Sequence, residues 1–419
     1  MLGQFLKKLM AGKSSIVDEY DMLVTRGTAA FRALDFCAAR DCLLGARAGR
    51  MLEPEGLLML GTALLYSGDL NEAEAVLRAV LNGNPGNVDA RKMLAMKYLL
   101  AGDWVEGFRL YEACRHDFVM KTPDQRLSRE WLQYINYAVA GVPLWRGEAL
   151  AGKRLLVWSE YGHGDAIMNM RFLPVLQERY RPSEIAALSM AVEKCLFEAA
   201  GVRNFFEARR EWKPAPGEFD CHCSIISLPY LLGVTTDEMP GRVPYLQVPE
   251  AKRNDWRHRV ASATGLKVGL AWAGNPDMPL DKLRSLSTAQ LAPLFAIQGV
   301  SYFSLQKGGG AHDALRTLGF PAIDLMEQCQ DFMDSAALID NLDLVISVDS
   351  AVAHLAGAVG KPVWLLNRFE SEWRWMRDRI DTPWYPNMRI FNQAEPLNWQ
   401  PVVDRVASEL RDMALRYVR

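Results

Sequence analysis

The string Gly162-His163-Gly164-Asp165 carries residue types that suit acid–base chemistry. Its glycines allow a backbone to approach a ligand closely, and the carboxylate of Asp165 could take a proton from a substrate as a general base. The same aspartate also suits the N-cap of a helix. A dinucleotide fingerprint would need its third glycine at Ile167, which excludes a nicotinamide site of that type. A general base and a helix cap are therefore the two roles open to Asp165.

A second string, Val348-Asp349-Ser350-Ala351-Val352-Ala353-His354, reads as a strand end followed by a helix start. The free N–H groups of a helix N-terminus favour an anion, and Ser350 adds a hydroxyl donor. Asp349 would repel phosphate, so we expect a sugar hydroxyl as its ligand. His354 lies one turn further along, on the helix face of Ser350. The alternative is an ordinary helix cap with a packed histidine.

Basic residues follow two further predicted strands. Arg284-Ser285 comes after the strand that ends at Trp272, and Lys307 follows the strand that contains Ser304. Both cations could complement a diphosphate. Taken one at a time they are equally compatible with solvated surface charges.

Several catalytic signatures are absent from the sequence. It contains no P-loop, no pair of aspartates at D-x-D spacing, no H-x-x-x-H zinc spacing and no nucleophile elbow. Cys221-His222-Cys223 resembles half of a metal site, but no second close pair of ligands follows it. We therefore expect a metal-independent reaction without a cofactor.

Short apolar runs separated by polar loops predict the strands that position these residues. The predicted strands are 153–158, 267–272, 300–305, 322–325, 342–347 and 362–366, and the predicted helices are 166–179, 286–295 and 351–359. The pattern is that of two successive α/β halves, in which ligands bind beyond the carboxyl ends of the strands.

The preceding part of the chain repeats with a period of 34 residues. The matching pairs are Leu60 and Leu94, Gly68 and Gly102, Asp69 and Asp103, and Glu72 and Glu106. Small residues at 61, 73 and 107 would let two helices approach closely. This period is the signature of tetratricopeptide repeats, here about three with the first degenerate. The repeats either hold a partner protein in a groove or serve as a structural cap.

Composition indicates a folded protein with more than one core. The chain has 419 residues, is 50% hydrophobic and carries a net charge of −2, which offers no general attraction to nucleic acid. No apolar stretch is long enough for a transmembrane helix, and the first residues lack a signal-peptide pattern. The odd number of seven cysteines argues against a disulfide framework. We therefore predict a cytoplasmic protein.

The chain as a whole resembles bacterial tetratricopeptide-repeat proteins whose C-terminal part is similar to glycosyltransferase family 9, the heptosyltransferases. More distantly it is similar to O-GlcNAc transferases. The resemblance rests on these strings: Pro143–Glu148, Leu155–Glu160 with Gly164-Asp165, Ser227–Pro229, Val243–Leu246, Val268–Pro276 with Arg284-Ser285, Ser304–Gln306, Val348–Gly357 and Pro383–Pro386.

This resemblance implies a GT-B architecture of two Rossmann-like domains facing a cleft. Asp165 corresponds to the catalytic base, and the segment from Asp349 through Ser350 and Ala351 to His354 corresponds to the donor sugar and phosphate site. Arg284, with Ser285 beside it, corresponds to a phosphate contact. The loops that contain Asn275, Gln306 and Lys307 correspond to the nucleotide-binding loops.

Two positions depart from the family pattern. The repeat-bearing relatives usually have Glu-Gln-Gly-Leu-Gly-Asp where this chain has Glu160-Tyr161-Gly162-His163-Gly164-Asp165, which makes His163 a second candidate for the base. Ser350 replaces the commoner threonine and keeps the hydroxyl. Cys221-His222-Cys223 falls where relatives have a variable structural strand, which further weakens the metal interpretation.

We therefore predict four regions: tetratricopeptide-like helical repeats at 1–125, a linker at 126–150, an acceptor-side Rossmann-like domain at 151–265 and a donor-side one at 266–419. The predicted function is an inverting, metal-independent glycosyltransferase of hexosyl or heptosyl type. It would move a sugar from a nucleotide sugar to a hydroxyl, on a protein held by the repeats. The alternative is a non-catalytic repeat scaffold with a degenerate transferase domain. The base of the nucleotide, the sugar, the acceptor and any homo-oligomer stay open.

Overall fold

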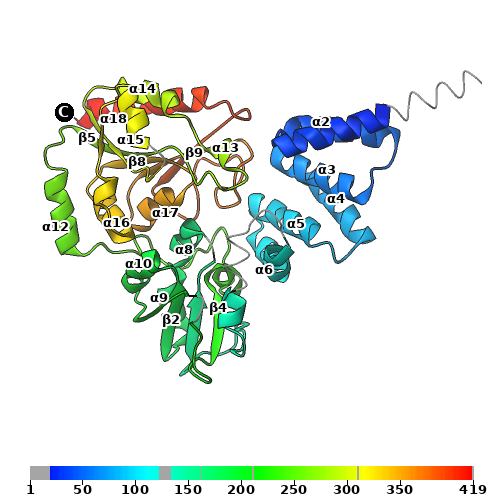
Figure 1. Cartoon of the computed structure of the whole chain (residues 1–419), viewed down its shortest axis with the longest axis horizontal. Helices are drawn as coiled ribbons and strands as arrows, with labels where there is room; N and C mark the ends of the chain where they lie inside the picture. Colours follow the sequence, from blue (N-terminus) through cyan, green and yellow to red (C-terminus); the bar gives the residue numbers. More distant parts are fainter. Residues whose placement is uncertain (1–18, 122–133, 161, 210–211, 309–310, 418–419) are drawn as a thin grey trace, which may run out of the picture. The chain divides into compact units, whose positions relative to one another are not determined.

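The computed structural model describes residues 19–121, 134–160, 162–209, 212–308 and 311–417 (Figure 1). The first eight residues of the predicted linker, 126–133, lie outside these ranges. The chain divides into two compact units. The repeat unit contains the chain up to Phe118 together with Phe369–Arg377, and the α/β unit contains Val119–Arg368 and Asp378–Arg419.

The repeat unit is a succession of helices, seen in Figure 1 from α2 in dark blue to α6 in cyan. A helix over residues 19–33 comes first. It is followed by α2 Phe36–Gly49, α3 Pro54–Ser67, α4 Leu70–Gly83, α5 Val88–Leu100 and α6 Trp104–Lys121. Gly68 ends α3 with a left-handed backbone at φ 97°, as the predicted break at Gly68-Asp69 requires. The predicted helical repeats are confirmed.

Glycines stand where the helices of the repeat unit approach most closely. A Cβ atom at Gly61 would lie 2.8 Å from the Leu77 side chain, and one at Gly107 would lie 2.6 Å from Cγ of Leu99. Real Cβ atoms do not approach other atoms so closely, because a densely packed interior leaves no spare volume. The small residues at these positions therefore determine the helix spacing, as predicted.

The segment Phe369–Arg377 packs with the repeats although it lies between two strands of the α/β region. The ring of Trp373 meets that of Phe108 edge to face, with centroids 5.5 Å apart. The backbone N–H of Arg377 donates to the carbonyl of Leu100 over 3.3 Å. No sequence pattern indicated this association, which joins the end of α5 and the start of α6 to a loop far along the chain.

The first sheet of the α/β unit has four parallel strands in the order β3-β2-β1-β4. Their bounds are β1 Arg154–Trp158, β2 Glu184–Ser189, β3 Asn204–Glu207 and β4 Cys221–Ser224. The helical elements of this half are α8 His163–Asn169, α9 Phe172–Tyr180, η1 Ala191–Glu193, α10 Lys194–Ala199, η2 Ile225–Ser227, α11 Leu228–Leu231 and α12 Glu250–Arg259. The sequence pattern predicts β1 but not β2 or β3.

The single helix predicted over 166–179 is wrong, since the structure has α8 and α9 with a break at Met170 and Arg171. Pro174 explains the break. Proline has no N–H and its ring collides with the carbonyl four residues earlier, so it is tolerated only in the first turn of a helix. A new helix must therefore begin shortly before Pro174.

The second sheet has six parallel strands in the order β10-β9-β8-β5-β6-β7. The strands are β5 Leu266–Ala271, β6 Val300–Ser304, β7 Ala322–Asp324, β8 Leu344–Val348, β9 Val363–Asn367 and β10 Met388–Asn392. The helical elements are α13 Asp281–Arg284, η3 Thr288–Leu291, α14 Ala292–Phe295, α15 Ala311–Thr317, η4 Met326–Gln328, α16 Phe332–Asp340, α17 Ala351–Ala358 and α18 Gln400–Tyr417. The predicted helix 286–295 is instead a 3-10 turn that starts after Ser287 and then a short helix with Pro293 in its first turn. The predicted helical-repeat and α/β architecture is confirmed.

The main core of this half lies between the second sheet and α18. Val268 and Leu344 from central strands are fully buried against Val402, Val406 and Leu410 of α18. These helix residues recur at spacings of four, which gives α18 one continuous apolar face. Among the residues that the structure describes, no helix has the length and apolar character of a membrane span.

Two helices join the halves of the α/β unit. A Cβ atom on Gly164 in α8 would lie 2.9 Å from Cδ2 of His354 and 3.7 Å from Cα of Ala351, both in α17. After α8, the buried guanidinium of Arg171 donates to the carbonyls of Pro240, Gly241 and Trp384. The first sheet is therefore held against the second by close backbone packing and by a buried cation.

Substituting Gly107→Ala is expected to lower the free energy of unfolding of the repeat unit by about 1–3 kcal/mol, because the new methyl overlaps Leu99. Gly83→Ala at the exposed end of α4 is the matched control, since a Cβ there meets nothing within 4 Å. The control should be neutral or stabilising by up to about 1 kcal/mol. Urea titrations followed by helical circular dichroism would measure both, and equal effects would contradict the packing described.

Gly164→Ala is expected to destabilise the α/β unit by about 1–3 kcal/mol, because its methyl would strike the His354 ring. Alanine otherwise favours a helix over glycine by up to about 1 kcal/mol. The sign of the change in thermal midpoint is therefore diagnostic: a more stable variant would show that α8 and α17 do not meet at this residue.

Candidate active site

The strand orders place the candidate residues at the two topological switch points of the α/β unit. In the second sheet the chain runs from β5 to β6 and β7 on one side, and then returns to β8 on the other side of β5. In the first sheet β1 lies between β2 and β4 in the same manner. Ligands of open parallel sheets bind beyond the carboxyl ends of the strands at such points. The loops after β1, β5 and β8 are therefore the candidate site.

A polar cluster forms at the carboxyl ends of β5 and β8. The carboxylate of Asp281 accepts hydrogen bonds from Nε of Arg284 over 2.9 Å and from Oγ of Ser285 over 2.8 Å. Nη1 of Arg284 donates to the carbonyl of Asp349 over 3.0 Å and lies 3.9 Å from its carboxylate. The structure thus brings three predicted residues, Arg284, Ser285 and Asp349, into one network.

Gly274 lets this network form. A side chain there would collide with Asp281 and Arg284, whose polar atoms lie 2.3 and 2.4 Å from the Cβ position. Its backbone N–H donates to Oγ of Ser285 over 2.9 Å. The neighbouring N–H of Ala273 donates to Oε1 of Gln306 over 3.1 Å, which adds the loop after β6 to the same edge.

Ser350 is the N-cap residue of α17, and its hydroxyl lies 3.0 Å from that of Ser347 rather than bonding to the helix start. Ala351 is the first residue of α17. This arrangement leaves the first N–H groups of an eight-residue helix at the sheet edge without a side-chain cap. The helix start has the polarity that attracts an anion.

The other residues predicted to bind the sugar nucleotide have contacts outside this network. Oδ1 of Asn275 accepts from the N–H of Asp277 within its own loop, and Nζ of Lys307 donates to the carbonyl of Cys329 over 3.3 Å. His354 is 3% exposed, and its Nδ1 lies 2.9 Å from the hydroxyl of Tyr385. Its contacts are those of a packed histidine, the alternative weighed from the sequence.

At the edge of the first sheet, Gly162 is the N-cap of α8 and Asp165 lies in the first turn. Asp165 is therefore not the N-cap residue itself, but its carboxylate still lies at the start of the helix. Its Oδ2 lies 2.5 Å from the position of a Cβ on Gly162, so the carboxylate folds back over the start of the helix into space that only glycine leaves open. Asp165 is partly exposed.

His163 is held by a carboxylate, that of Glu193, which no sequence pattern indicates. Its Nδ1 lies 2.7 Å from Oε1 of Glu193. Glu193 is 1% exposed, and its other oxygen accepts from the hydroxyls of Ser159 and Ser189. Glu193 follows β2, a strand that was not predicted, so no local signal linked it to His163. Asp281 was also missed, although its position three residues before Arg284 is the spacing of a helical ion pair.

Burial shifts the pKa values of Arg171 and Tyr245, which lie close to α8. Desolvation lowers the pKa of the Arg171 guanidinium. Desolvation also raises the pKa of the Tyr245 hydroxyl to about 12. That hydroxyl donates to the carbonyl of Ile167 in α8 and lies 3.3 Å from the hydroxyl of Tyr385, which itself contacts His354. Helix α8, the connecting chain and α17 are linked through these hydroxyls.

Cys221, His222 and Cys223 lie in the buried strand β4. Nδ1 of His222 accepts a hydrogen bond from the indole N–H of Trp158 over 3.0 Å, so the ring is engaged in the core. Within the described ranges, no group of three or more His, Cys, Asp and Glu side chains lies close enough to hold a metal ion.

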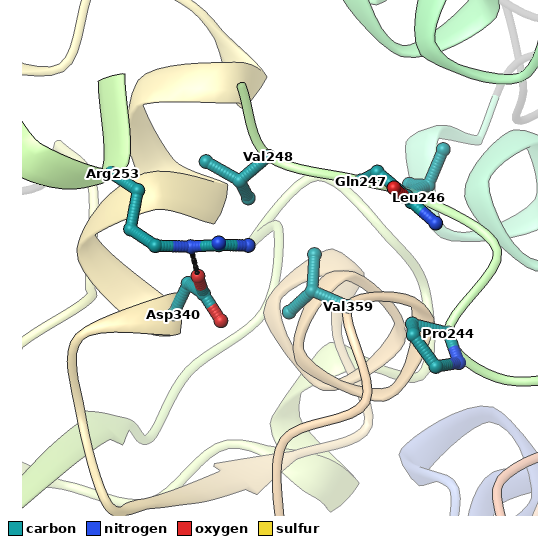
Figure 2. A pocket seen from close by; sticks show the side chains of 7 residues that line it. All are labelled: Pro244, Leu246, Gln247, Val248, Arg253, Asp340 and Val359. Atoms are coloured by element: carbon teal, nitrogen blue, oxygen red, sulfur yellow. Dashed lines mark hydrogen bonds and ion pairs between the residues drawn. The ribbon is translucent and has the colours of Figure 1, made fainter. Parts of the chain in front are cut away.

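A hollow of about 220 Å³ lies elsewhere in the α/β unit (Figure 2). It is bordered by the stretch from Pro244 to Val248 and by Val359 at the end of α17. Figure 2 shows Arg253 and Asp340 paired across one side of it. None of the predicted site residues lines this hollow.

Two family models match parts of the chain. Residues 64–112 match the tetratricopeptide repeat, and residues 330–402 match glycosyltransferase family 9 (heptosyltransferase). The second match contains Asp349, Ser350, Ala351 and His354 and ends before α18 does. The loop with Asp165 lies outside it.

Protein FlbA of Caulobacter vibrioides is 30% identical over 372 residues, which cover 82% of this chain and 58% of FlbA. The chain thus spans less than two thirds of that relative.

The solved structure of E. coli ADP-heptose LPS heptosyltransferase II is 15% identical with a TM-score of 0.46, over 64% of this chain and all of that one. The O-GlcNAc transferase of Thermobaculum terrenum is 12% identical with a TM-score of 0.29, over 96% and 94% of the two chains. The two family models thus match an earlier tetratricopeptide-repeat segment and a later family 9 segment of this chain, which confirms the resemblance inferred from its sequence.

Proposed function

We propose that the chain is an inverting glycosyltransferase that moves a sugar from a nucleotide sugar to an acceptor hydroxyl. The observation that carries this proposal is the packing of α8 on α17, in which Gly164, next to Asp165, lies against His354 and Ala351 at the start of α17. The family 9 match over residues 330–402 supports the donor half.

In the proposed donor site the diphosphate lies at the start of α17. The helix N–H groups and the Ser350 hydroxyl face the phosphates, and the Arg284 guanidinium adds a positive charge. Asp281 holds that guanidinium through Nε, which preorganises it toward charge that grows on the leaving group. Asp349 orients a sugar hydroxyl, while the loops of Asn275, Gln306 and Lys307 line the nucleotide.

In the proposed reaction Asp165 is the general base. The acceptor oxygen attacks the anomeric carbon and gives its proton to the Asp165 carboxylate. The bond from the anomeric carbon to the phosphate oxygen breaks, and its electron pair leaves with the nucleoside diphosphate. We propose that Arg284 and the start of α17 supply the positive charge that a metal ion supplies in other transferases, so that the reaction is metal-independent.

We further propose a protein acceptor held by the repeats and a cytoplasmic site of action. Tetratricopeptide helices stack into surfaces that bind other proteins. All seven cysteines are free thiols, which suits a reducing compartment. A homo-oligomer is compatible with this function but is not needed by the proposed site.

Thermal unfolding with a panel of ADP-, UDP-, GDP-, CMP- and dTDP-sugars tests the donor assignment. A sugar nucleotide at 100 times its dissociation constant should stabilise the protein by about 2.7 kcal/mol. The stabilisation should disappear in Asp349→Ala and persist in Asp412→Ala, an exposed position of α18. If no member of the panel stabilises the protein, the non-catalytic scaffold becomes the better description.

Substituting Asp165→Asn tests the base. Asparagine keeps the shape of the side chain but does not accept the proton, so turnover should fall by about 10²–10⁴-fold. Donor binding in the thermal assay should be unchanged. A variant with full turnover would show that Asp165 is not the base.

A further inference from the structure

We propose that His163 is a catalytic residue on the leaving-group side, donating a proton from Nε2 to the departing diphosphate, and that Glu193 is the positioning residue that holds it. The inference rests on the proposed function, since a diphosphate leaves only from a nucleotide-sugar donor. It assigns a role to the departure from the family pattern at position 163.

The starting observation is the burial of the Glu193 carboxylate. A carboxylate removed from water must be hydrogen-bonded on both oxygens to be tolerated. One oxygen accepts from Ser159 over 3.1 Å and from Ser189, and the other lies 2.7 Å from Nδ1 of His163. Because the carboxylate is an acceptor, Nδ1 carries the hydrogen of this bond. The imidazole is therefore fixed in orientation, and Nε2 is the nitrogen that faces away from Glu193.

The imidazole is accessible to a ligand. The His163 side chain is 35% exposed, whereas that of Glu193 is 2% exposed. No partner of Nε2 is recorded among the described residues. A histidine that served only to satisfy a buried acid could lie wholly inside the protein, but about a third of this side chain is open to solvent.

The His163 ring lies next to a helix of the second half of the α/β unit. Its centroid lies 5.1 Å from that of Phe332, which is the first residue of α16. A helix that leads into β8 runs opposite to the strands, so its first residue lies at their carboxyl edge. The next residue, Gly164, packs against the first turn of α17. His163 thus lies where the donor diphosphate is proposed to bind.

The carboxylates at the start of α16 are already paired with a cation. Lys252 in α12 forms ion pairs with Asp331 over 3.5 Å and with Asp334, both at the start of α16. Glu193 is the carboxylate that the structure records in contact with the imidazole. The titratable and charged groups on the elements around His163 are Asp165 in α8, Glu193 in η1, Asp331 at the N-cap of α16, Asp334 and Asp340 within α16, and His354 in α17.

The proposed step is balanced with the base already assigned. His163 enters the proposed step as the imidazolium, with one hydrogen on Nδ1 toward the Glu193 anion and one on Nε2. As the bond from the anomeric carbon to the phosphate oxygen breaks, the proton on Nε2 moves to that oxygen. The acceptor oxygen forms the new bond and passes its proton to Asp165. His163 ends neutral with its hydrogen on Nδ1, Glu193 stays an anion, and both catalytic groups exchange protons with solvent before the next turnover.

Kinetics of His163→Gln and Glu193→Gln form the first test. Both variants should lose kcat by about 10²-fold, with KM for the nucleotide sugar changed less than about threefold, because the proton is needed in the transition state and not for binding. Exposed His258→Gln and Glu250→Gln in α12 are matched controls and should retain wild-type kcat. Circular dichroism and thermal midpoints establish that each variant is folded. A His163→Gln protein with wild-type kcat would overturn the proposal.

The second test does not depend on turnover. Nitrogen chemical shifts of His163 are followed by NMR while inorganic pyrophosphate, which has the charges of the leaving group, is added. The Nε2 resonance should move in the wild-type protein and not in folded Glu193→Gln. Unmoved resonances would overturn the leaving-group role, even if His163→Gln is inactive. A wild-type protein that responds to pyrophosphate but turns over no sugar nucleotide would instead count against the proposed function.

Discussion

The close approach of α8 and α17 at Gly164 is the contact on which the candidate active site depends. With only hydrogen at this position, the backbone of α8 lies directly against His354 and the start of α17. Asp165 and His163 flank the glycine, so the contact that joins the two sheets also sets their functional loops against each other. Packed interiors do not yield smoothly to added volume, and a larger residue would separate the two halves of the site.

Buried carboxylates organise both sides of this contact. On the second sheet Asp281 holds Arg284 and Ser285, and on the first Glu193 holds His163. A carboxylate that leaves water must find hydrogen-bond donors, and in each case the donors are the side chains at the sheet edge. The polar groups are thus oriented before a ligand arrives, which is the condition under which fixed dipoles and charges stabilise a transition state most effectively.

The repeat unit is tied to the rest of the chain in more than one place. Besides the connection after α6, it contains Phe369–Arg377, which follows β9 and precedes β10. The indole of Trp373 and the ring of Phe108 are packed edge to face in this unit. The repeat unit is therefore built partly from a loop of the α/β region, which lies outside the 34-residue period.

Local pattern by itself determined the repeat, the strands β1, β5, β6, β7, β8 and β9, and the candidate loops that follow them. Apolar runs, glycines and a fixed period act over a few residues, and parallel strands share one carboxyl edge whatever their order. Tertiary structure alone decided three contacts. Glu193 holds His163, which lies 30 residues away in the chain, and Arg171 donates to the carbonyl of Trp384, 213 residues away. Gly164 allows the close packing of α8 on α17. These contacts depend on strand order and on how two sheets dock, and neither is encoded in any short stretch of the chain.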